Sequence, residues 1–225
     1  MLRIAGITPF STVDWPGKLA CVAFLAGCPW RCPYCQNHML RDGSAATMDE
    51  NDLFGLLQRR RGLLDGVVFS GGEPLGQPDV IDAARTARKM GFLVGLHTSG
   101  AFPRRLRELL PLLDWVGLDI KAPWNAYDAI TGACGTGELV QQSLDAVLAS
   151  NVALETRTTW HPDQLSSEDI AAIGHDLAQR GVSTWAVQAY RHIGTTGELP
   201  DRTVYPSDVP ADLPGLFAHF EFRRA

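Results

Sequence analysis

The chain has 225 residues, of which 45% are hydrophobic and 20% charged, and its formal net charge is −5. A chain of this length buries a core without covalent staples, so we expect a single domain over residues 1–225, and the acidic balance argues against general nucleic-acid affinity. No apolar run reaches the roughly 20 residues that cross a bilayer and residues 1–6 do not form a signal peptide, so we expect a cytoplasmic protein without membrane contact.

Residues 1–18 carry no regular pattern, and Asp14–Gly17 has the composition of a turn. From residue 19 to about residue 195, short apolar runs alternate with stretches of helical periodicity. The predicted strands are 19–27, 66–70, 92–97, 115–120, 152–158 and 182–189. The predicted helices are 47–62, opened by a capping box at Thr47–Glu50, then 78–91, 103–113, 137–150 and 166–180. The tail, 196–225, is rich in loops, with a last helix expected near 213–220.

This alternation indicates the fold class. Six strands that alternate with helices predict parallel βαβ units, each with a right-handed crossover. A closed barrel of this type needs eight units. We therefore predict an α/β fold, an open and partial (β/α)6 TIM-like barrel.

Polar and glycine-rich residues follow each predicted strand. In chain order these are the cysteines, Gly71–Glu73, His97–Ser99, Asp119–Lys121, Arg157 and Gln188–His192. In parallel barrels the loops at the C-terminal strand ends converge over the axis and form the active face. The sequence therefore predicts an enzyme with its site at that end.

The first of these loops holds three of the five cysteines, Cys28, Cys32 and Cys35, in the spacing C-x3-C-x2-C. A disulfide framework is not expected in a chain of this size. Three thiolates can hold three corners of an iron–sulfur cluster, which uses four when fully protein-bound, and so leave one iron open. The alternative is a closed zinc site completed by His38, although zinc ligands are usually spaced as two separated pairs.

The remaining polar residues each have two interpretations. Gly71 and Gly72 allow a close backbone approach to a ligand or form an ordinary turn, and Glu73 can accept from an ammonium group. Asp119 and Lys121 share one face of a strand, so they can bind a zwitterion or form a structural ion pair.

Arg157 and Tyr34 also have two interpretations each. Arg157 suits a carboxylate ligand or lies on the surface, and Tyr34 stacks on a ring or packs the loop. Cys21 is expected in the core. Cys134 is a loop thiol to which no role is assigned.

Taken together, the motifs resemble a known family. The matching segments are Ser11–Lys18, Gly27–Asn37 with an aromatic residue before the last cysteine, Phe69–Pro74, Leu118–Ala122 and Glu155–Thr159. They resemble the radical SAM superfamily and, within its glycyl-radical activating group, the anaerobic ribonucleoside-triphosphate reductase activating proteins. The likeness runs from about residue 4 to residue 195.

The resemblance implies a [4Fe-4S] cluster on Cys28, Cys32 and Cys35, with S-adenosylmethionine on its open iron. The residues that the resemblance then places around S-adenosylmethionine are Tyr34 and Gln36 beside the adenosyl part, Gly71, Gly72 and Glu73 at the ammonium, and Asp119, Lys121 and Arg157 in the rest of the cradle. Relatives carry a histidine at a position where this chain has Arg191, with His192 one residue later, so either residue is a candidate to face the cofactor.

The implied activity is cleavage of S-adenosylmethionine to a 5′-deoxyadenosyl radical, which produces a glycyl radical on a partner enzyme. The implied partners are anaerobic ribonucleotide reductase and a flavodoxin- or ferredoxin-type electron donor. The sequence has no second cysteine cluster for an inserted ferredoxin-like module. Two alternatives stay open: a radical SAM enzyme with a small-molecule substrate, and a zinc-binding module that is not an enzyme.

Overall fold

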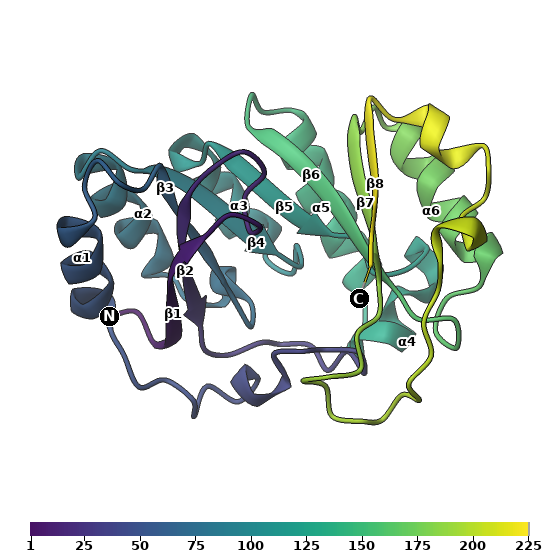
Figure 1. Cartoon of the computed structure of the whole chain (residues 1–225), viewed down its shortest axis with the longest axis horizontal. Helices are drawn as coiled ribbons and strands as arrows, with labels where there is room; N and C mark the ends of the chain where they lie inside the picture. Colours follow the sequence, from purple (N-terminus) through teal and green to yellow (C-terminus); the bar gives the residue numbers. More distant parts are fainter. Residues whose placement is uncertain (225) are drawn as a thin grey trace.

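The computed structural model describes residues 1–224 and contains one eight-stranded sheet whose strands follow chain order from β1 to β8. The strands are β1 Ile4–Ser11, β2 Ala20–Leu25, β3 Gly66–Gly71, β4 Leu93–Thr98, β5 Trp115–Asp119, β6 Ala153–Trp160, β7 Thr184–Ala189 and β8 His219–Arg223. From β2 onward all neighbouring strands are parallel. The sheet curves across the molecule (Figure 1), which confirms the predicted partial barrel.

Helices connect the parallel strands from β2 to β7 (Figure 1). They are α1 Glu50–Arg59, α2 Val80–Lys89, α3 Pro103–Leu109, α4 Tyr127–Thr131, α5 Thr136–Leu148 and α6 Ser167–Gln179. Short 3-10 turns lie between them, at His38–Leu40, Pro74–Gly76, Leu110–Leu112, Trp124–Ala126, Pro206–Asp208 and Leu213–Leu216. Among residues 1–224, no helix combines the length and apolarity needed to cross a membrane.

The prediction that residues 1–18 are irregular was wrong. Ile4–Ser11 forms strand β1, which pairs antiparallel with β2 at the edge of the sheet. Most of its side chains are partly or fully exposed, and it contains Pro9, a residue that is uncommon in strands. The segment therefore shows no apolar alternation in the sequence. The predicted turn is present between the two strands, where Lys18 N–H donates to the Trp15 carbonyl at 3.1 Å.

The helix predicted near 213–220 was also wrong. Leu213–Leu216 forms one 3-10 turn that contains Pro214 and Gly215, and His219–Arg223 then forms strand β8. Proline and glycine oppose a continuous helix here, and the alternation of polar and aromatic residues in 219–223 has the period of a strand. Strand β8 pairs with β7 and so extends the sheet beyond the six predicted strands.

The start of α1 is the third correction. The capping box is formed by Asp49 and Asp52, not by Thr47 and Glu50. Met48 instead exchanges backbone hydrogen bonds of 3.0 Å with Ile4. The predicted capping pattern was therefore displaced by two residues, because the segment before the helix is tied to β1.

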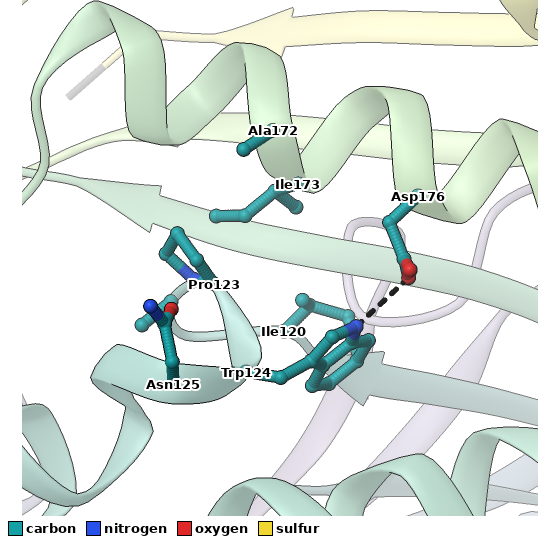
Figure 2. A pocket seen from close by; sticks show the side chains of 8 residues that line it. Ile120, Pro123, Trp124, Asn125, Ala172, Ile173 and Asp176 are labelled. Carbon is teal, nitrogen blue, oxygen red and sulfur yellow. Dashed lines mark hydrogen bonds between the residues drawn. The ribbon is translucent and has the colours of Figure 1, made fainter.

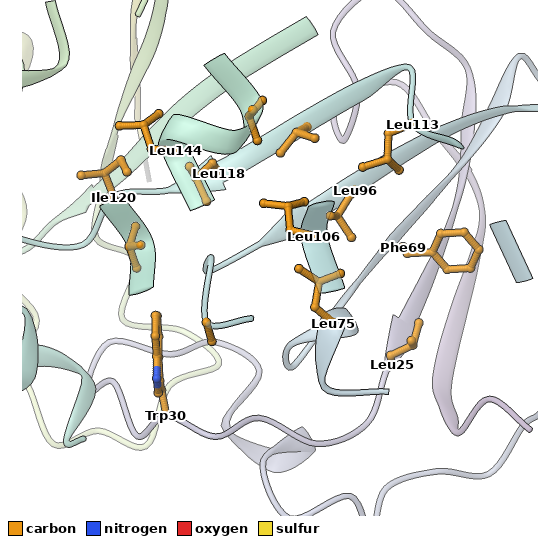
Figure 3. Packing of buried hydrophobic residues seen from close by; sticks show 14 of the residues in the cluster. Leu25, Trp30, Phe69, Leu75, Leu96, Leu106, Leu113, Leu118, Ile120 and Leu144 are labelled. Carbon is orange, nitrogen blue, oxygen red and sulfur yellow. The ribbon is translucent and has the colours of Figure 1, made fainter. Parts of the chain in front are cut away.

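Side chains of the strands alternate between two apolar clusters. The larger cluster lies between the sheet and the helices, where Leu96 and Leu118 pack with Leu106 and Leu144 (Figure 3). Trp30 of the cysteine loop belongs to the same cluster. The smaller cluster comprises Trp15, Ala20, Val22, Val68 and Trp115. Because both faces of the strands are packed, their C-terminal ends are fixed in position beneath the polar loops.

Candidate functional site

A cavity of about 890 Å³ lies at the C-terminal ends of the parallel strands. It is bordered by loops that follow β2 to β7 and by the end of β8. The predicted site residues that line it are Cys28, Cys32, Tyr34, Cys35, Gln36, Gly71, Gly72, Asp119, Lys121, Arg157 and Arg191. Glu73 is the one predicted site residue that is not part of the wall. The fold therefore brings together residues that lie far apart in the sequence.

Backbone hydrogen bonds hold the cysteine loop. Cys28 N–H donates to the Arg41 carbonyl at 3.0 Å, and the Arg41 side chain donates to the Cys32 carbonyl at 2.5 Å. Arg31 N–H donates to the Thr131 carbonyl at 2.8 Å, which ties the loop to α4. The position of the cysteines therefore depends mainly on main-chain contacts.

The thiols of this loop lie in a poorly solvated place. Burial raises the pKa of the Cys28 thiol to about 12 and also raises the pKa of Cys32, while the nearby Lys121 charge acts in the opposite direction. All five cysteines are free thiols; Cys21 is buried in β2 and Cys134 is exposed. Thiols become thiolates when they bind a metal, so the cationic Lys121 suits a site that gains negative charge.

No three or more His, Cys, Asp or Glu side chains in residues 1–224 are arranged to hold one metal ion. An iron–sulfur cluster makes a different demand, since each thiolate binds a separate iron of a larger body. Three cysteines of one loop that all line a large cavity fit that demand.

Gly71 and Gly72 serve the packing of the cysteine loop as well as lining the cavity. Gly71 has φ +117°, and a Cβ there would lie 2.3 Å from the Leu25 amide nitrogen. A Cβ on Gly72 would lie 2.3 Å from the Gly27 carbonyl oxygen and 3.3 Å from Cys28 Cβ. Only glycine fits this contact, and it sets the position where the cysteine loop begins.

Glu73 is fully buried beneath the wall. Its carboxylate accepts from the Leu75 and Ser99 amides at 3.0 and 2.7 Å, from the Thr98 hydroxyl at 2.8 Å and from the Ser99 hydroxyl. The Glu73 side chain thus does not line the cavity, and its predicted place at an ammonium group stays a prediction. It joins the loops after β3 and β4 instead.

Lys121 and Asp119 form an ion pair of 2.9 Å inside the cavity. The Lys121 ammonium also lies 5.8 Å from the centre of the Tyr34 ring. Burial disfavours the charge of Lys121, but Asp119 and Tyr34 outweigh it and hold its pKa well above the ordinary value. The Tyr34 hydroxyl is buried and has no hydrogen-bond partner within the part of the chain that the structure describes. A buried polar atom of this kind indicates a place for a ligand.

Arg157 lines the cavity on β6, opposite Asp119 of the neighbouring strand, and is 8% exposed. Its Nε donates to Glu155 Oε1 at 2.7 Å, and its guanidinium lies 5.0 Å from the centre of the Trp115 ring. A terminal nitrogen is 3.0 Å from His97 Nε2, which is also 2.7 Å from the Asp14 carbonyl. Burial and the Arg157 charge hold the pKa of His97 well below its ordinary value, so this histidine is neutral.

Arg191 and His192 are placed differently relative to the cavity. Arg191 lines the cavity and donates to Gln36 Oε1 at 3.1 Å, and Gln36 in turn donates to the Arg191 carbonyl at 3.3 Å. These bonds connect the loop after β2 with the loop after β7. His192 is not part of the wall, and its Nδ1 lies 3.3 Å from the Tyr190 hydroxyl.

Two arginines of the cavity wall were missed from the sequence. Arg223 and Arg224, at the end of β8, border the cavity. They were missed because the tail was predicted to be loop-rich, with a helix near 213–220 and no strand after it. The signal that would have found them is the strand periodicity of 219–223, which places Arg223 at the end of a further parallel strand.

A second, smaller cavity of about 360 Å³ lies beside the loop after β5, lined by Ile120, Ala122–Asn125 and residues of α6 (Figure 2). Its wall is mostly apolar, and Trp124 Nε1 donates to Asp176 across it at 2.9 Å. The residues of this loop therefore alternate, with Asp119 and Lys121 toward the large cavity and Ile120 and Ala122 toward the small one.

Comparisons with known proteins agree with this geometry. The family model described as the radical SAM superfamily matches residues 22–177. A protein of Methanocaldococcus jannaschii named as a candidate glycyl-radical enzyme activating enzyme is 34% identical over 83% of this chain and 79% of its own length. The pyruvate formate-lyase-activating enzyme of Clostridium pasteurianum is 36% identical over 59% of this chain and 58% of its own length.

Solved structures resemble the fold. A radical SAM methyltransferase from Sphaerobacter thermophilus has a TM-score of 0.68 at 14% identity, covering 94% of this chain and 67% of that one. QueE from Escherichia coli has a TM-score of 0.57 at 20% identity, covering 83% and 82%. At these identities the likeness concerns the fold alone.

Proposed function

The chain belongs to the radical SAM superfamily, whose members use a [4Fe-4S] cluster and S-adenosylmethionine, and on this premise we propose that it generates a glycyl radical on a partner enzyme. We propose anaerobic ribonucleoside-triphosphate reductase as that partner. The observation that carries the proposal is the match to the candidate activating enzyme of M. jannaschii over 83% of the chain. The chain is thus homologous to glycyl-radical enzyme activating enzymes along most of its length.

The residues present fit both cofactors. Cys28, Cys32 and Cys35 would hold the cluster, and the open iron would be available to S-adenosylmethionine. The buried Tyr34 hydroxyl without a partner and the buried charges of Lys121 and Arg157 support a polar, charged ligand in the same cavity. With one electron on the cluster, the two cofactors would supply methionine and a 5′-deoxyadenosyl radical, which would take a hydrogen atom from a glycine Cα.

The chain's own residues would bind and orient the cofactor. Lys121 stays protonated because Asp119 and Tyr34 stabilise its charge, so it suits the carboxylate of the methionine part. Arg157 offers a second, fork-shaped donor to the same kind of group. Gln36 and Arg191, which bridge two loops of the cavity wall, would flank the adenosyl part together with Tyr34.

The rest of the machinery comes from outside the chain. An electron for the cluster would come from a flavodoxin- or ferredoxin-type donor. The glycine would be presented by a loop of the partner enzyme at the C-terminal strand ends. A cytoplasmic location belongs to this proposal, since a reduced cluster requires a reducing compartment.

A test uses the reduced, cluster-loaded protein with S-adenosylmethionine. Alone, it should cleave the cofactor slowly, because no hydrogen donor is in place. Addition of an anaerobic ribonucleotide reductase from the same organism should produce a stable doublet in the electron paramagnetic resonance spectrum, from a backbone glycine of the partner. If no glycyl radical appears with any glycyl-radical enzyme of that organism, the activase proposal fails.

A second candidate is a radical SAM enzyme that acts on another substrate. PqqA peptide cyclase of Gluconobacter oxydans is 36% identical over 41% of this chain, although this covers only 25% of that enzyme. Several basic side chains in the wall also suit an anionic small molecule. In the same assay, stoichiometric 5′-deoxyadenosine formation driven by a metabolite or peptide, without a glycyl radical, would favour this candidate.

A further inference from the structure

Glu155 is a buried carboxylate that carries no role in the proposed chemistry. It is 3% exposed and lies on β6, two residues before Arg157, so the two side chains share one face of the strand. Burial of a charged carboxylate is costly unless its oxygens are paired. The groups that pair with Glu155 therefore decide whether it can stay charged at this place.

Both oxygens of Glu155 are paired by arginines. Oε1 accepts from Arg157 Nε at 2.7 Å and from an Arg223 terminal nitrogen at 2.9 Å, and Oε2 accepts from the other Arg223 terminal nitrogen at 2.9 Å. Arg223 is also held by Glu221 at 2.7 Å on its own strand. Burial opposes ionisation of Glu155, but the bonds from Arg223 and the charge of Arg157 outweigh it and lower its pKa, so the carboxylate is charged.

Arg223 reaches this carboxylate from the last strand. Strand β8 pairs in parallel with β7, and Arg223 lies opposite Gln188 at the cavity end of that strand. It thus spans β7 to contact β6. The bidentate, fork-shaped contact fixes the carboxylate in direction as well as in position.

The guanidinium of Arg157 is confined on its remaining sides. Trp115 lies beside it at 5.0 Å, and His97 is 3.0 Å from one terminal nitrogen. The guanidinium also needs the absence of a side chain at Gly117, because a Cβ on that residue would lie 2.6 Å from an Arg157 terminal nitrogen. Among the described residues no hydrogen-bond partner is found for the second terminal nitrogen of Arg157, and the side chain lines the cavity.

We propose that Arg223 is a positioning residue which, through Glu155, aims Arg157 into the cavity and thereby raises the affinity for S-adenosylmethionine. The inference deepens the proposed function, since it rests on the role assigned to Arg157. If Arg223 has this role, strand β8 contributes to cofactor binding, although it lies outside the six strands that the sequence predicted.

The test is calorimetric titration of S-adenosylmethionine into the anaerobic, cluster-loaded protein, with iron content and melting temperature measured alongside. Arg157→Gln is the reference and should weaken binding by about ten- to a hundred-fold, the worth of one charge-assisted hydrogen bond. Arg223→Gln should weaken it by about three- to thirty-fold, at unchanged iron content. Arg223→Lys keeps the charge and should recover part of the loss.

Two further variants make the test specific. Gly117→Ala should displace the Arg157 guanidinium without a change of charge and weaken binding in the same direction. Arg202→Gln is the matched control, because Arg202 forms an exposed ion pair of 2.7 Å with Asp163 that does not line the cavity, and it should leave binding unchanged. The double variant Arg157→Gln/Arg223→Gln should bind no more weakly than Arg157→Gln alone.

That non-additivity separates positioning from a general structural role, which would lower the melting temperature and add to the loss. An Arg223→Gln protein that binds like the Arg202→Gln control overturns the inference, and so does full additivity in the double variant. Unchanged binding in Arg157→Gln overturns both the inference and the role proposed for Arg157. None of these results depends on a partner enzyme, so failure of the activase proposal is detected separately by the radical assay.

Discussion

Two sides of the large cavity are built in different ways. We call Cys28, Cys32, Cys35 and the adjoining Gly71–Gly72 turn the cysteine side, and Glu155, Arg157 and Arg223 the arginine side. On the cysteine side three proposed cluster ligands lie within eight residues and are fixed by main-chain hydrogen bonds and by close backbone packing. On the arginine side, side chains separated by up to 68 residues are fixed by one another's charges.

The difference concerns what each side tolerates. Main-chain contacts survive most side-chain substitutions, so the cysteine side should respond only to loss of a ligand or to crowding of the backbone. A buried ion network fails when one partner is removed, because the others are left charged and unpaired. Substitutions on the arginine side should therefore weaken cofactor binding by degrees. Substitutions on the cysteine side should either leave the site intact or abolish it.

The largest expected effect is loss of the cluster from the cysteine side. Cys28→Ala, Cys32→Ala and Cys35→Ala should each abolish the iron–sulfur absorbance of anaerobically reconstituted protein, since only three protein ligands are proposed. Cys21→Ala and Cys134→Ala serve as controls and should keep it. Loss of iron in His38→Ala alone would contradict the three-ligand assignment.

Crowding of the backbone is the second way to break the cysteine side. Gly72→Ala introduces a Cβ 2.3 Å from the Gly27 carbonyl oxygen, so the cysteine loop must shift. We expect a fall of about 2 kcal/mol or more in unfolding free energy and a reduced iron content, since strained backbone positions cost roughly that much. Gly6→Ala, where nothing lies within 4 Å of the added atom, is the control. Equal iron content in the two variants would show that the close contact is not important.

The sequence predicted the two sides to different extents. The spacing of the cysteines and the strands from β2 to β7 were predictable because they depend on local patterns. The pairing of Glu155 with Arg223 was not, since it depends on β8, a strand in a tail that was predicted to be loop-rich with a helix near 213–220. The direction of the Glu73 side chain was not predictable for a related reason. Its motif gives its loop, whereas its hydrogen-bond partners, Thr98 and Ser99, lie at the end of the next strand.

A smaller, graded effect is expected from Lys121, which lies between the two sides. Lys121→Ala should weaken S-adenosylmethionine binding by about ten- to a hundred-fold while iron content stays nearly intact. Titration of the cofactor into the reconstituted protein measures this. A collapsed melting temperature together with unchanged affinity would instead identify the 2.9 Å pair of Lys121 and Asp119 as purely structural.

The smallest effect is expected at Gln36. Its bonds with Arg191, at 3.1 and 3.3 Å, are exposed to solvent, where water replaces lost partners at little cost. Gln36→Ala should change the affinity for S-adenosylmethionine by no more than about five-fold, corresponding to roughly 1 kcal/mol. A loss as large as that of Lys121→Ala would mean that this bridge between two loops closes the cavity around the cofactor.

The most direct test asks whether the two sides meet at one cofactor. The electron paramagnetic resonance spectrum of the reduced cluster is recorded before and after addition of S-adenosylmethionine. If the cysteine side leaves one iron open and the arginine side binds the same molecule, the spectrum should change on addition, and Arg157→Gln should require a higher concentration for the same change. A spectrum that S-adenosylmethionine leaves unaltered at saturating concentration, in protein with full iron content, would contradict the account.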